Sequence, residues 1–125
     1  MTNSLLHIGL QVLEVDVQKF YLDILNCEPK NNFTIQAEDA FLIFGISREV
    51  RVQLVSSGGI ELELFIDDIK KTFTFGHICF RSTDAERIIE NAREKGYHTF
   101  IRKRNSNEIY FISDSNQNLF EIKKI

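Results

Sequence analysis

The sequence has little of what marks several classes of protein. It contains one proline and only two cysteines, Cys27 and Cys79, so we expect no disulfide framework and two free thiols in a reducing compartment. No apolar run approaches the roughly 20 residues of a membrane-spanning helix. No long basic run offers a sequence-independent grip on nucleic acid phosphates. We therefore expect neither a membrane nor a nucleic acid as a partner.

The chain is instead suited to a packed core. Its 125 residues are 43% hydrophobic and carry a formal net charge of -3. This composition is too apolar for a disordered chain, and the length fits one domain or two small similar halves that share a core. The first residues, MTNSLL, show no positive start and no cleavable apolar segment, so we expect a cytoplasmic protein.

The first half of the chain reads as a strand, a helix and three strands. Apolar residues alternate with polar ones over 5–12, which predicts a half-buried strand. Apolar residues then recur with helical spacing after Asp16, a residue suited to an N-cap, and Pro29 stops any continuation of the helix. Three apolar runs separated by short connections predict strands in antiparallel hairpins, at 41–46, 50–55 and 60–66. The stretch 31–38 is compatible with a loop or with an extra edge strand.

The second half repeats this order. The segment 74–82 predicts a strand, and a helix follows in which Thr83 and Glu86 have the spacing of a capping box. Gly96 stands where a left-handed C-cap belongs. Three strand-like runs complete the half, at 98–104, 108–114 and 118–125.

The two halves form an internal repeat. HIGLQV at 7–12 matches HICFRS at 77–82, and each half ends in a glutamate between apolar residues. The predicted fold is α+β: two βαβββ modules, about 1–68 and 72–125, in one domain over 1–125. We expect curved mixed sheets with the helices outside and a cleft inside.

Strand parity places several ionisable residues on the faces that the helices do not cover, namely His7, Glu61, Glu63, His77 and Glu121. One histidine and one glutamate from each half can converge in a cleft between the sheets. Two imidazoles and two carboxylates suit a divalent transition metal, whose charge the two carboxylates neutralise.

In its order of segments the chain resembles the vicinal oxygen chelate superfamily, which includes glyoxalase I, extradiol dioxygenases, fosfomycin-resistance enzymes and bleomycin-binding proteins. The resemblance rests on HIGLQV, FYLDIL, IELELF, GHICF and NLFEI, and it covers nearly the whole chain. It implies four metal ligands: His7, Glu63, His77 and Glu121. Glu61 and Gln53 stay open as alternatives to the second ligand. The chain departs from the family at the turn 114–118 and at Asn26-Cys27, where family members often have other residues.

The resemblance also implies a function. A divalent ion (Zn, Ni, Co, Mn or Fe) would hold two vicinal oxygens of a small-molecule substrate, and Glu121 or Glu63 would move a proton through an enediolate, as in a glyoxalase-type lyase or isomerase. The alternatives are a non-catalytic drug-binding or resistance protein of the bleomycin type and an Fe(II) extradiol dioxygenase. Because relatives commonly form two-fold dimers, we expect a homodimer.

A few further residues have simpler interpretations. We expect His98 on the surface and Cys79 as a small buried residue, although Cys79 shares the face of His77. One of the arginines of the second half could hold a carboxylate or phosphate of the substrate, the choices being Arg81, Arg102 and Arg104.

Overall fold

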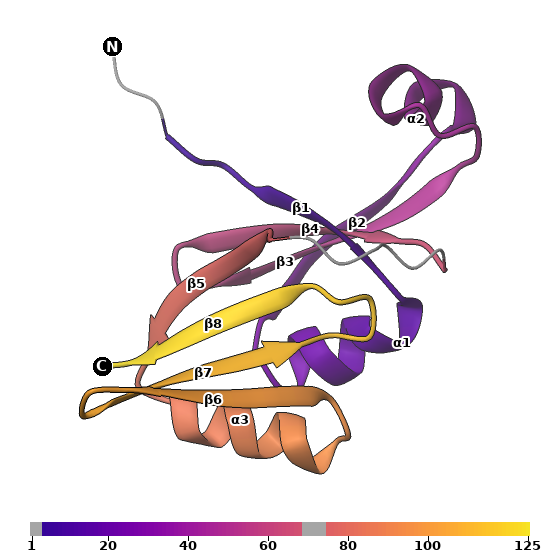
Figure 1. Ribbon diagram of the computed structural model, residues 1–125. Coiled ribbons are helices and arrows are strands. Elements are labelled where there is room, and N and C mark those ends of the chain that lie inside the picture. Colours follow the sequence, from indigo (N-terminus) through magenta and orange to yellow (C-terminus); the bar gives the residue numbers. More distant parts are fainter. Residues whose placement is uncertain (1–3, 69–74) are drawn as a thin grey trace. The chain divides into compact units, whose positions relative to one another are not determined.

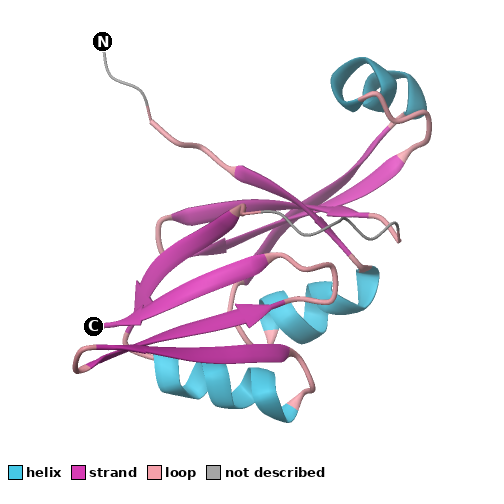
Figure 2. Cartoon of the chain, in the orientation of Figure 1, coloured by secondary structure: helices cyan, strands magenta, loops and turns pink. Residues whose placement is uncertain are grey.

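The computed structural model describes residues 4–68 and 75–125, and it contains two four-stranded mixed sheets with helices (Figures 1 and 2). Contacts divide the chain into two compact units, Met1–Ile69 (unit 1) and Lys70–Ile125 (unit 2). Both units follow the βαβββ plan, with an additional helix in unit 1, so the predicted fold class is confirmed. No helix in the described part of the chain is long and apolar enough to cross a membrane.

Unit 1 pairs its first strand with its last. Its elements are β1 (Ile8–Val12), α1 (Glu14–Asp16), η1 (Val17–Leu22), β2 (Glu28–Ile35), α2 (Ala37–Phe44), β3 (Val50–Ser57) and β4 (Ile60–Ile66). The strands lie in the order β1-β4-β3-β2. β1 runs parallel to β4, and the other neighbours are antiparallel.

Unit 2 has the same strand plan. Its elements are β5 (His77–Ser82), α3 (Ala85–Glu94), β6 (His98–Arg104), β7 (Asn107–Ser113) and β8 (Leu119–Lys124). The order is β5-β8-β7-β6, with β5 parallel to β8. Residue 74, where the sequence places the start of this strand, lies outside the described residues.

The first helical stretch starts earlier than predicted. It begins at Glu14 and continues as the π-helix η1, at whose end the N–H of the C-cap Asp23 bonds to the Gln18 carbonyl five residues earlier. The N-cap of the whole stretch is Leu13, whereas Asp16 stands directly before η1 with helical φ and ψ, is buried, and makes no capping bond with its side chain. η1 ends at Leu22, and after a short turn Asn26 has a left-handed φ of 58°. Asparagine tolerates this conformation better than most residues.

The prediction of a strand at 41–46 is wrong, because the first four of these residues belong to helix α2. The strand that pairs with β3 is β2, which includes most of the ambiguous stretch 31–38. A short apolar run cannot be assigned to helix or strand by periodicity alone. The signals that favour a helix are the acidic residues Glu38 and Asp39 in its first turn and Gly45 behind it, with a φ of 75°.

Helix α3 ends as predicted but begins differently. Its N-cap is Asp84 rather than Thr83, and the Asp84 N–H bonds to the Ser82 hydroxyl at 2.9 Å. At the C-terminal end Gly96 adopts a φ of 83°. The Gly96 and Tyr97 N–H groups bond to the carbonyls of Arg93 and Ala92, which is a Schellman motif.

The two faces of each sheet have different roles. In unit 2 the cross-strand pairs Tyr110–Ile122 and Ile112–Phe120 share the buried face. Helix α3 contacts β6, β7 and β8 and buries the predicted stripe Ala85, Ile88, Ile89 and Ala92. The opposite face carries the polar side chains, because successive residues of a strand point to opposite sides.

The turn between β7 and β8 is built around one buried carboxylate. Asp114 accepts hydrogen bonds from the N–H groups of Asn116 and Asn118 and from the Asn118 amide at 2.8 Å. All three residues are buried, and Gln117 between the asparagines has a φ of 65°. This network fixes the start of β8, the strand that carries Glu121.

Replacing Asp114 by alanine should lower the free energy of unfolding by about 1–3 kcal/mol or more, because it leaves three buried donors without their acceptor. Urea unfolding measures this change. The control is Asp68→Ala at an exposed aspartate, which should change the value by less than about 0.5 kcal/mol. Equal stability of the two variants would contradict the structural role of the turn.

Candidate metal centre

In unit 1 a histidine and a glutamate meet at the edge of the sheet. His7 Nε2 lies 3.1 Å from Glu63 Oε1, with side chains that are 48% and 20% exposed. The parallel register pairs Gly9 with Glu63, and His7 lies two residues before Gly9, so both side chains leave the sheet on the same face. The predicted ligands of the first half are therefore in contact.

Unit 2 repeats the arrangement at the equivalent strands. His77 Nε2 lies 3.3 Å from Glu121 Oε1, with side chains that are 42% and 18% exposed. β5 pairs with β8 so that Cys79 faces Glu121, and His77 stands two residues earlier. The second His–Glu pair is thus also in contact.

A backbone carbonyl determines which ring nitrogen of His77 carries the hydrogen in the neutral imidazole. His77 Nδ1 lies 3.0 Å from the carbonyl oxygen of Phe75, which can only accept, so Nδ1 carries the hydrogen. In the neutral ring Nε2 then presents a lone pair toward the Glu121 carboxylate. Two facing acceptors repel each other unless a cation lies between them or a proton is added to the ring. The donors therefore fit a divalent metal, and a carbonyl that holds the other ring nitrogen is the usual support of a metal-binding histidine.

Each His–Glu pair offers two donor groups to a metal ion. Among residues 4–68 and 75–125, no group of three or more His, Cys, Asp or Glu side chains is close enough to hold a metal ion. Zinc sites in proteins usually have three or four protein ligands. Neither pair by itself therefore makes a complete site of this kind.

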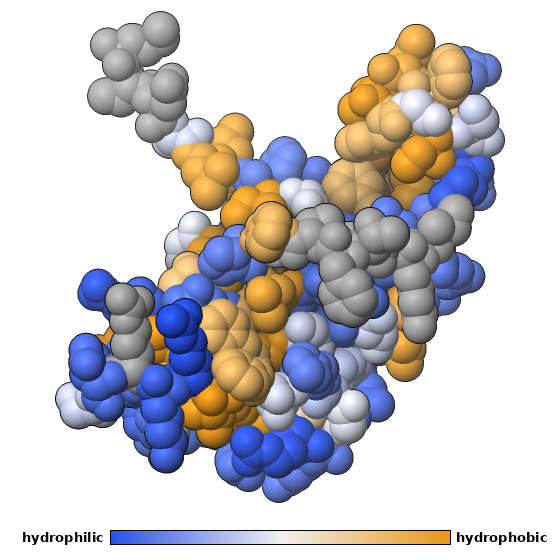
Figure 3. All heavy atoms as spheres, viewed as in Figure 1, coloured by the Kyte–Doolittle hydropathy of each residue, from blue (hydrophilic) through white to orange (hydrophobic). Residues whose placement is uncertain are grey.

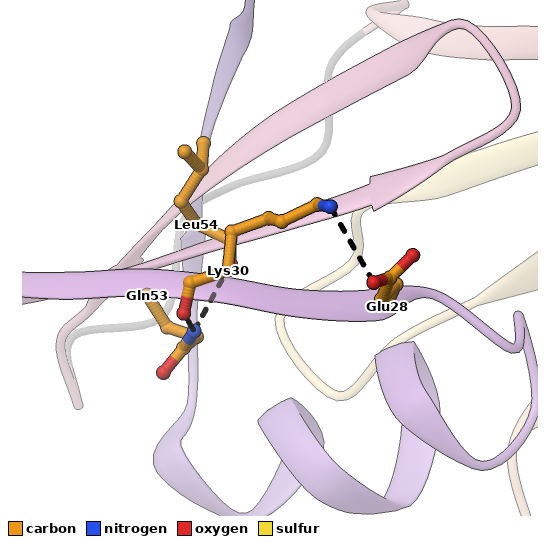
Figure 4. A network of polar contacts seen from close by, with 4 residues as sticks. All are labelled: Glu28, Lys30, Gln53 and Leu54. Atoms are coloured by element: carbon orange, nitrogen blue, oxygen red, sulfur yellow. Dashed lines mark hydrogen bonds and ion pairs between the residues drawn. The ribbon is translucent and has the colours of Figure 1, made fainter.

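The two alternatives to Glu63 are placed differently. Glu61 is exposed and lies on the same face of β4 as Glu63. Gln53 pairs with Leu64, so its side chain leaves the sheet on the other face. Its amide nitrogen donates to the backbone carbonyls of Lys30 at 3.2 Å and Leu54 at 3.0 Å (Figure 4). Of the three residues, Glu63 alone has a described contact with His7.

The two cysteines have opposite environments. Cys27 is buried, and burial raises the pKa of its thiol to about 11. Cys79 is exposed, which contradicts the prediction of a small buried residue. Partial desolvation and the neighbouring Glu121 carboxylate raise the pKa of the Cys79 thiol. The alternation of β5 explains the exposure, since Cys79 follows His77 on the face away from α3.

Basic residues form a row on the same face of unit 2. Arg81 of β5 pairs with Lys123 of β8. On the other side of Lys123 lies Ile109 of β7, which in turn pairs with Arg102 of β6. This row is two residues along the strands from the row of Glu121. Like charges that face each other across strands are unfavourable, and a bound anion relieves them. Lys123 was not singled out from the sequence, although its parity with Glu121 places it on this face.

Aromatic pairs also lie on these strands. The rings of Phe100 and Phe111 are 6.2 Å apart in unit 2, and Phe111 pairs with Glu121. In unit 1 the ring of Phe65 packs against Phe44 of α2 with centroids 5.2 Å apart. His98 is exposed, as expected.

Comparisons with known proteins extend this description. The sequence matches no protein-family model and no curated protein. The fold is similar to that of a fosfomycin resistance protein, FosX, from Listeria monocytogenes, with a TM-score of 0.75, 20% identity, and coverage of 100% of this chain and 95% of the other. A structure of a mutant of that protein with Mn(II) and 1S,2S-dihydroxypropylphosphonic acid gives a TM-score of 0.72 at 20% identity and covers 98% and 93%. A glyoxalase family protein from Enterococcus faecalis gives 0.67 at 17% identity and covers 96% of both chains. The resemblance seen in the sequence is thus confirmed at the level of the fold.

Proposed function

We propose that the chain is a metal-dependent lyase or isomerase that acts on a small molecule with two vicinal oxygens. The observation that supports this function is the meeting of one imidazole and one carboxylate at equivalent strands of each unit, at 3.1 and 3.3 Å. In this proposal His7, Glu63, His77 and Glu121 supply the ligands of one divalent ion. The Mn(II) bound by the Listeria protein of the same fold supports a divalent ion here.

The protein's own residues would position the substrate and move a proton. When bound, the ion holds two neighbouring oxygens and stabilises negative charge on them. One of the two carboxylates, Glu63 or Glu121, takes the proton from the carbon beside these oxygens and delivers it to the adjacent carbon. The histidines stay neutral ligands, and the Phe75 carbonyl keeps the His77 ring oriented through Nδ1.

The first test is metal binding by the purified protein. We expect the parent chain to bind Zn²⁺, Ni²⁺, Co²⁺ or Mn²⁺, and His77→Ala to abolish tight binding while leaving the fold intact, because His77 is exposed. Calorimetric titration measures the affinity and circular dichroism the fold. Since only neutral imidazole binds a metal, the affinity should fall as the pH is lowered through the range in which imidazoles take up protons.

The matched control is His98→Ala. His98 lies on the same face of the sheet but three strands from His77, which is about 14 Å away at the usual strand spacing. This variant should bind metal as the parent does. Unchanged binding by both His77→Ala and Glu121→Gln, or a parent chain that takes up no divalent metal, would refute the site and favour the drug-binding alternative.

A second candidate function is action on a small phosphonate such as fosfomycin. The specific observation in its favour is the basic row of unit 2, in which Arg81 and Lys123 face each other beside the row of Glu121. A phosphonate group would neutralise these charges and leave its other oxygens near the His77–Glu121 pair. The Listeria protein was crystallised with such a phosphonate.

An activity assay separates the two functions. The first proposal predicts that the metal-loaded protein consumes methylglyoxal hemithioacetal, that Glu121→Gln slows the reaction by about 100-fold or more, and that fosfomycin is untouched. The second predicts consumption of fosfomycin, with affinity reduced about tenfold by Arg81→Met through loss of a charge-assisted hydrogen bond. Nuclear magnetic resonance of both compounds reports the products directly. Turnover of fosfomycin alone would overturn the first proposal.

We also propose that the chain forms a homodimer. Helix α2 exposes consecutive apolar side chains, with Phe41, Leu42 and Ile43 exposed by 57%, 79% and 65%. Figure 3 shows the hydrophobic surface that gathers over this helix. Exposed apolar patches of this kind mark interaction sites, and two-fold pairing of identical surfaces is the commonest assembly of soluble proteins.

Sedimentation should therefore give a dimer for the parent chain at micromolar concentration. Leu42→Glu should shift it to the monomer, because the charge would be buried between the two copies. The control is Val15→Glu, at an exposed apolar residue of α1, which should stay dimeric. A monomeric parent chain would refute the proposal.

In this proposal the protein works in the cytoplasm. Both cysteines are free, and the exposed Cys79 thiol stands beside Glu121. An exposed thiol persists in a reducing compartment, whereas an oxidising one favours its conversion to a disulfide.

A further inference from the structure

Unit 1 contains a cavity that the metal site does not use. It has a volume of about 210 Å³ and lies between the end of β1, helix α2, the start of β3 and the end of β4. The residues that matter below are Gly9, Phe44, Ile46, Phe65 and Asp67. Most of the lining is apolar, so the cavity favours an apolar group over a polar one.

The cavity adjoins the His7–Glu63 pair. The register pairs Gly9 with Glu63 and Gln11 with Phe65, so the cavity shares the face of the sheet on which His7 and Glu63 meet. Gly9 follows His7 by two positions, and in an extended chain this corresponds to a distance of about 7 Å. A ligand held at the His–Glu pair can reach the cavity through a short arm.

The shape of the cavity depends on a glycine and an aromatic pair. A Cβ atom at Gly9 would lie 3.0 Å from Cε2 of Phe65, closer than ordinary contact, so the bare backbone lets the ring lie over β1. Phe44 meets Phe65 edge to face, with centroids 5.2 Å apart. An aromatic guest can join such an arrangement with its own edge or face.

The charges at the lining and the volume of the cavity restrict the class of ligand further. The carboxylate of Asp67 at the lining is paired with Arg48, so the cavity does not require a cation. An apolar protein cavity of about 150 Å³ is known to accept benzene. The larger volume here suits one aromatic ring with its first substituent atoms.

We propose that this cavity binds a single aromatic ring of the substrate, while the vicinal oxygens of the same molecule lie at His7 and Glu63. The substrate class is therefore a small aryl compound with two neighbouring oxygens on a short arm. The position of the oxygens rests on the proposed function, whereas the binding of the ring does not depend on a metal.

The test uses indole as the probe, with the metal-free full-length protein. Titration should shift the backbone amide signals of Gly9, Ile46 and Phe65 in a saturable manner. Ile46→Trp should abolish these shifts by filling the cavity, because Ile46 is a half-buried part of its lining. The matched control is Val15→Trp, which places the same side chain at an exposed position of unit 1 and should leave indole binding unchanged.

A second measurement uses the parent protein alone and so does not depend on whether a variant folds. It records intermolecular nuclear Overhauser contacts between indole and the Phe65 ring. Such contacts support the proposal. Their absence at saturating indole, or shifts confined to residues outside the cavity, would overturn it. Indole binding without metal binding would contradict the proposed function alone, and metal binding without indole binding would contradict the aromatic cavity alone.

For the metal-loaded protein, phenylglyoxal and methylglyoxal hemithioacetals extend the test to turnover. Ile46→Trp should raise KM for the phenyl compound and leave that for the methyl compound unchanged. An equal effect on both compounds would show that the cavity does not receive the ring.

Discussion

Parallel pairing of the first and last strands of each unit is the constraint on which the site depends. In unit 1 the pairing sets Gly9 beside Glu63, and in unit 2 it sets Cys79 beside Glu121. Both histidines then fall two residues before a paired position, on the face of the glutamate. A shift of one residue in either register would turn the histidine and the glutamate to opposite faces and remove the pair. The register itself is held by the apolar residues on the helix-covered face, such as Leu64 and Ile122, which are fully buried.

Because alternate residues of a strand point to opposite faces, the side chains that stabilise each sheet lie on one face and those available to a ligand lie on the other. The buried face carries most of the apolar core, and the other face carries the imidazoles and carboxylates together with rings such as those of Phe65 and Phe111. Substitutions on the second face therefore act on binding with little effect on packing. The turn around Asp114 links stability to the site, because its buried hydrogen-bond network determines where β8, the strand that carries Glu121, begins.

The sequence was sufficient for the parts of the fold that repeat. The matching starts and ends of the two halves predicted two βαβββ modules, and strand parity placed His7, Glu61, Glu63, His77 and Glu121 on the faces away from the helices. The choice of His7, Glu63, His77 and Glu121 among the candidates followed from the family resemblance and not from spacing. The sequence was not sufficient for the segment 41–46, whose short apolar run fits either a helix or a strand. That error also hid the aromatic cavity, since Phe44 and its neighbours line it only when α2 is helical. The exposure of Cys79 was missed because a small apolar side chain was given more weight than its parity with His77.

The difference between the two hairpins has an evolutionary meaning. β6 and β7 are joined by two residues, of which Asn105 has a φ of 57°, whereas the corresponding connection of unit 1, between β2 and β3, contains a whole helix. Equal strand orders in the two units are what duplication of a half-length segment would leave, and an insertion between β2 and β3 would account for helix α2. An insertion at this point leaves the pairing of β1 with β4 untouched. The architecture can thus acquire new specificity by lengthening one hairpin, without a change in the strand pairing that sets each histidine beside its glutamate.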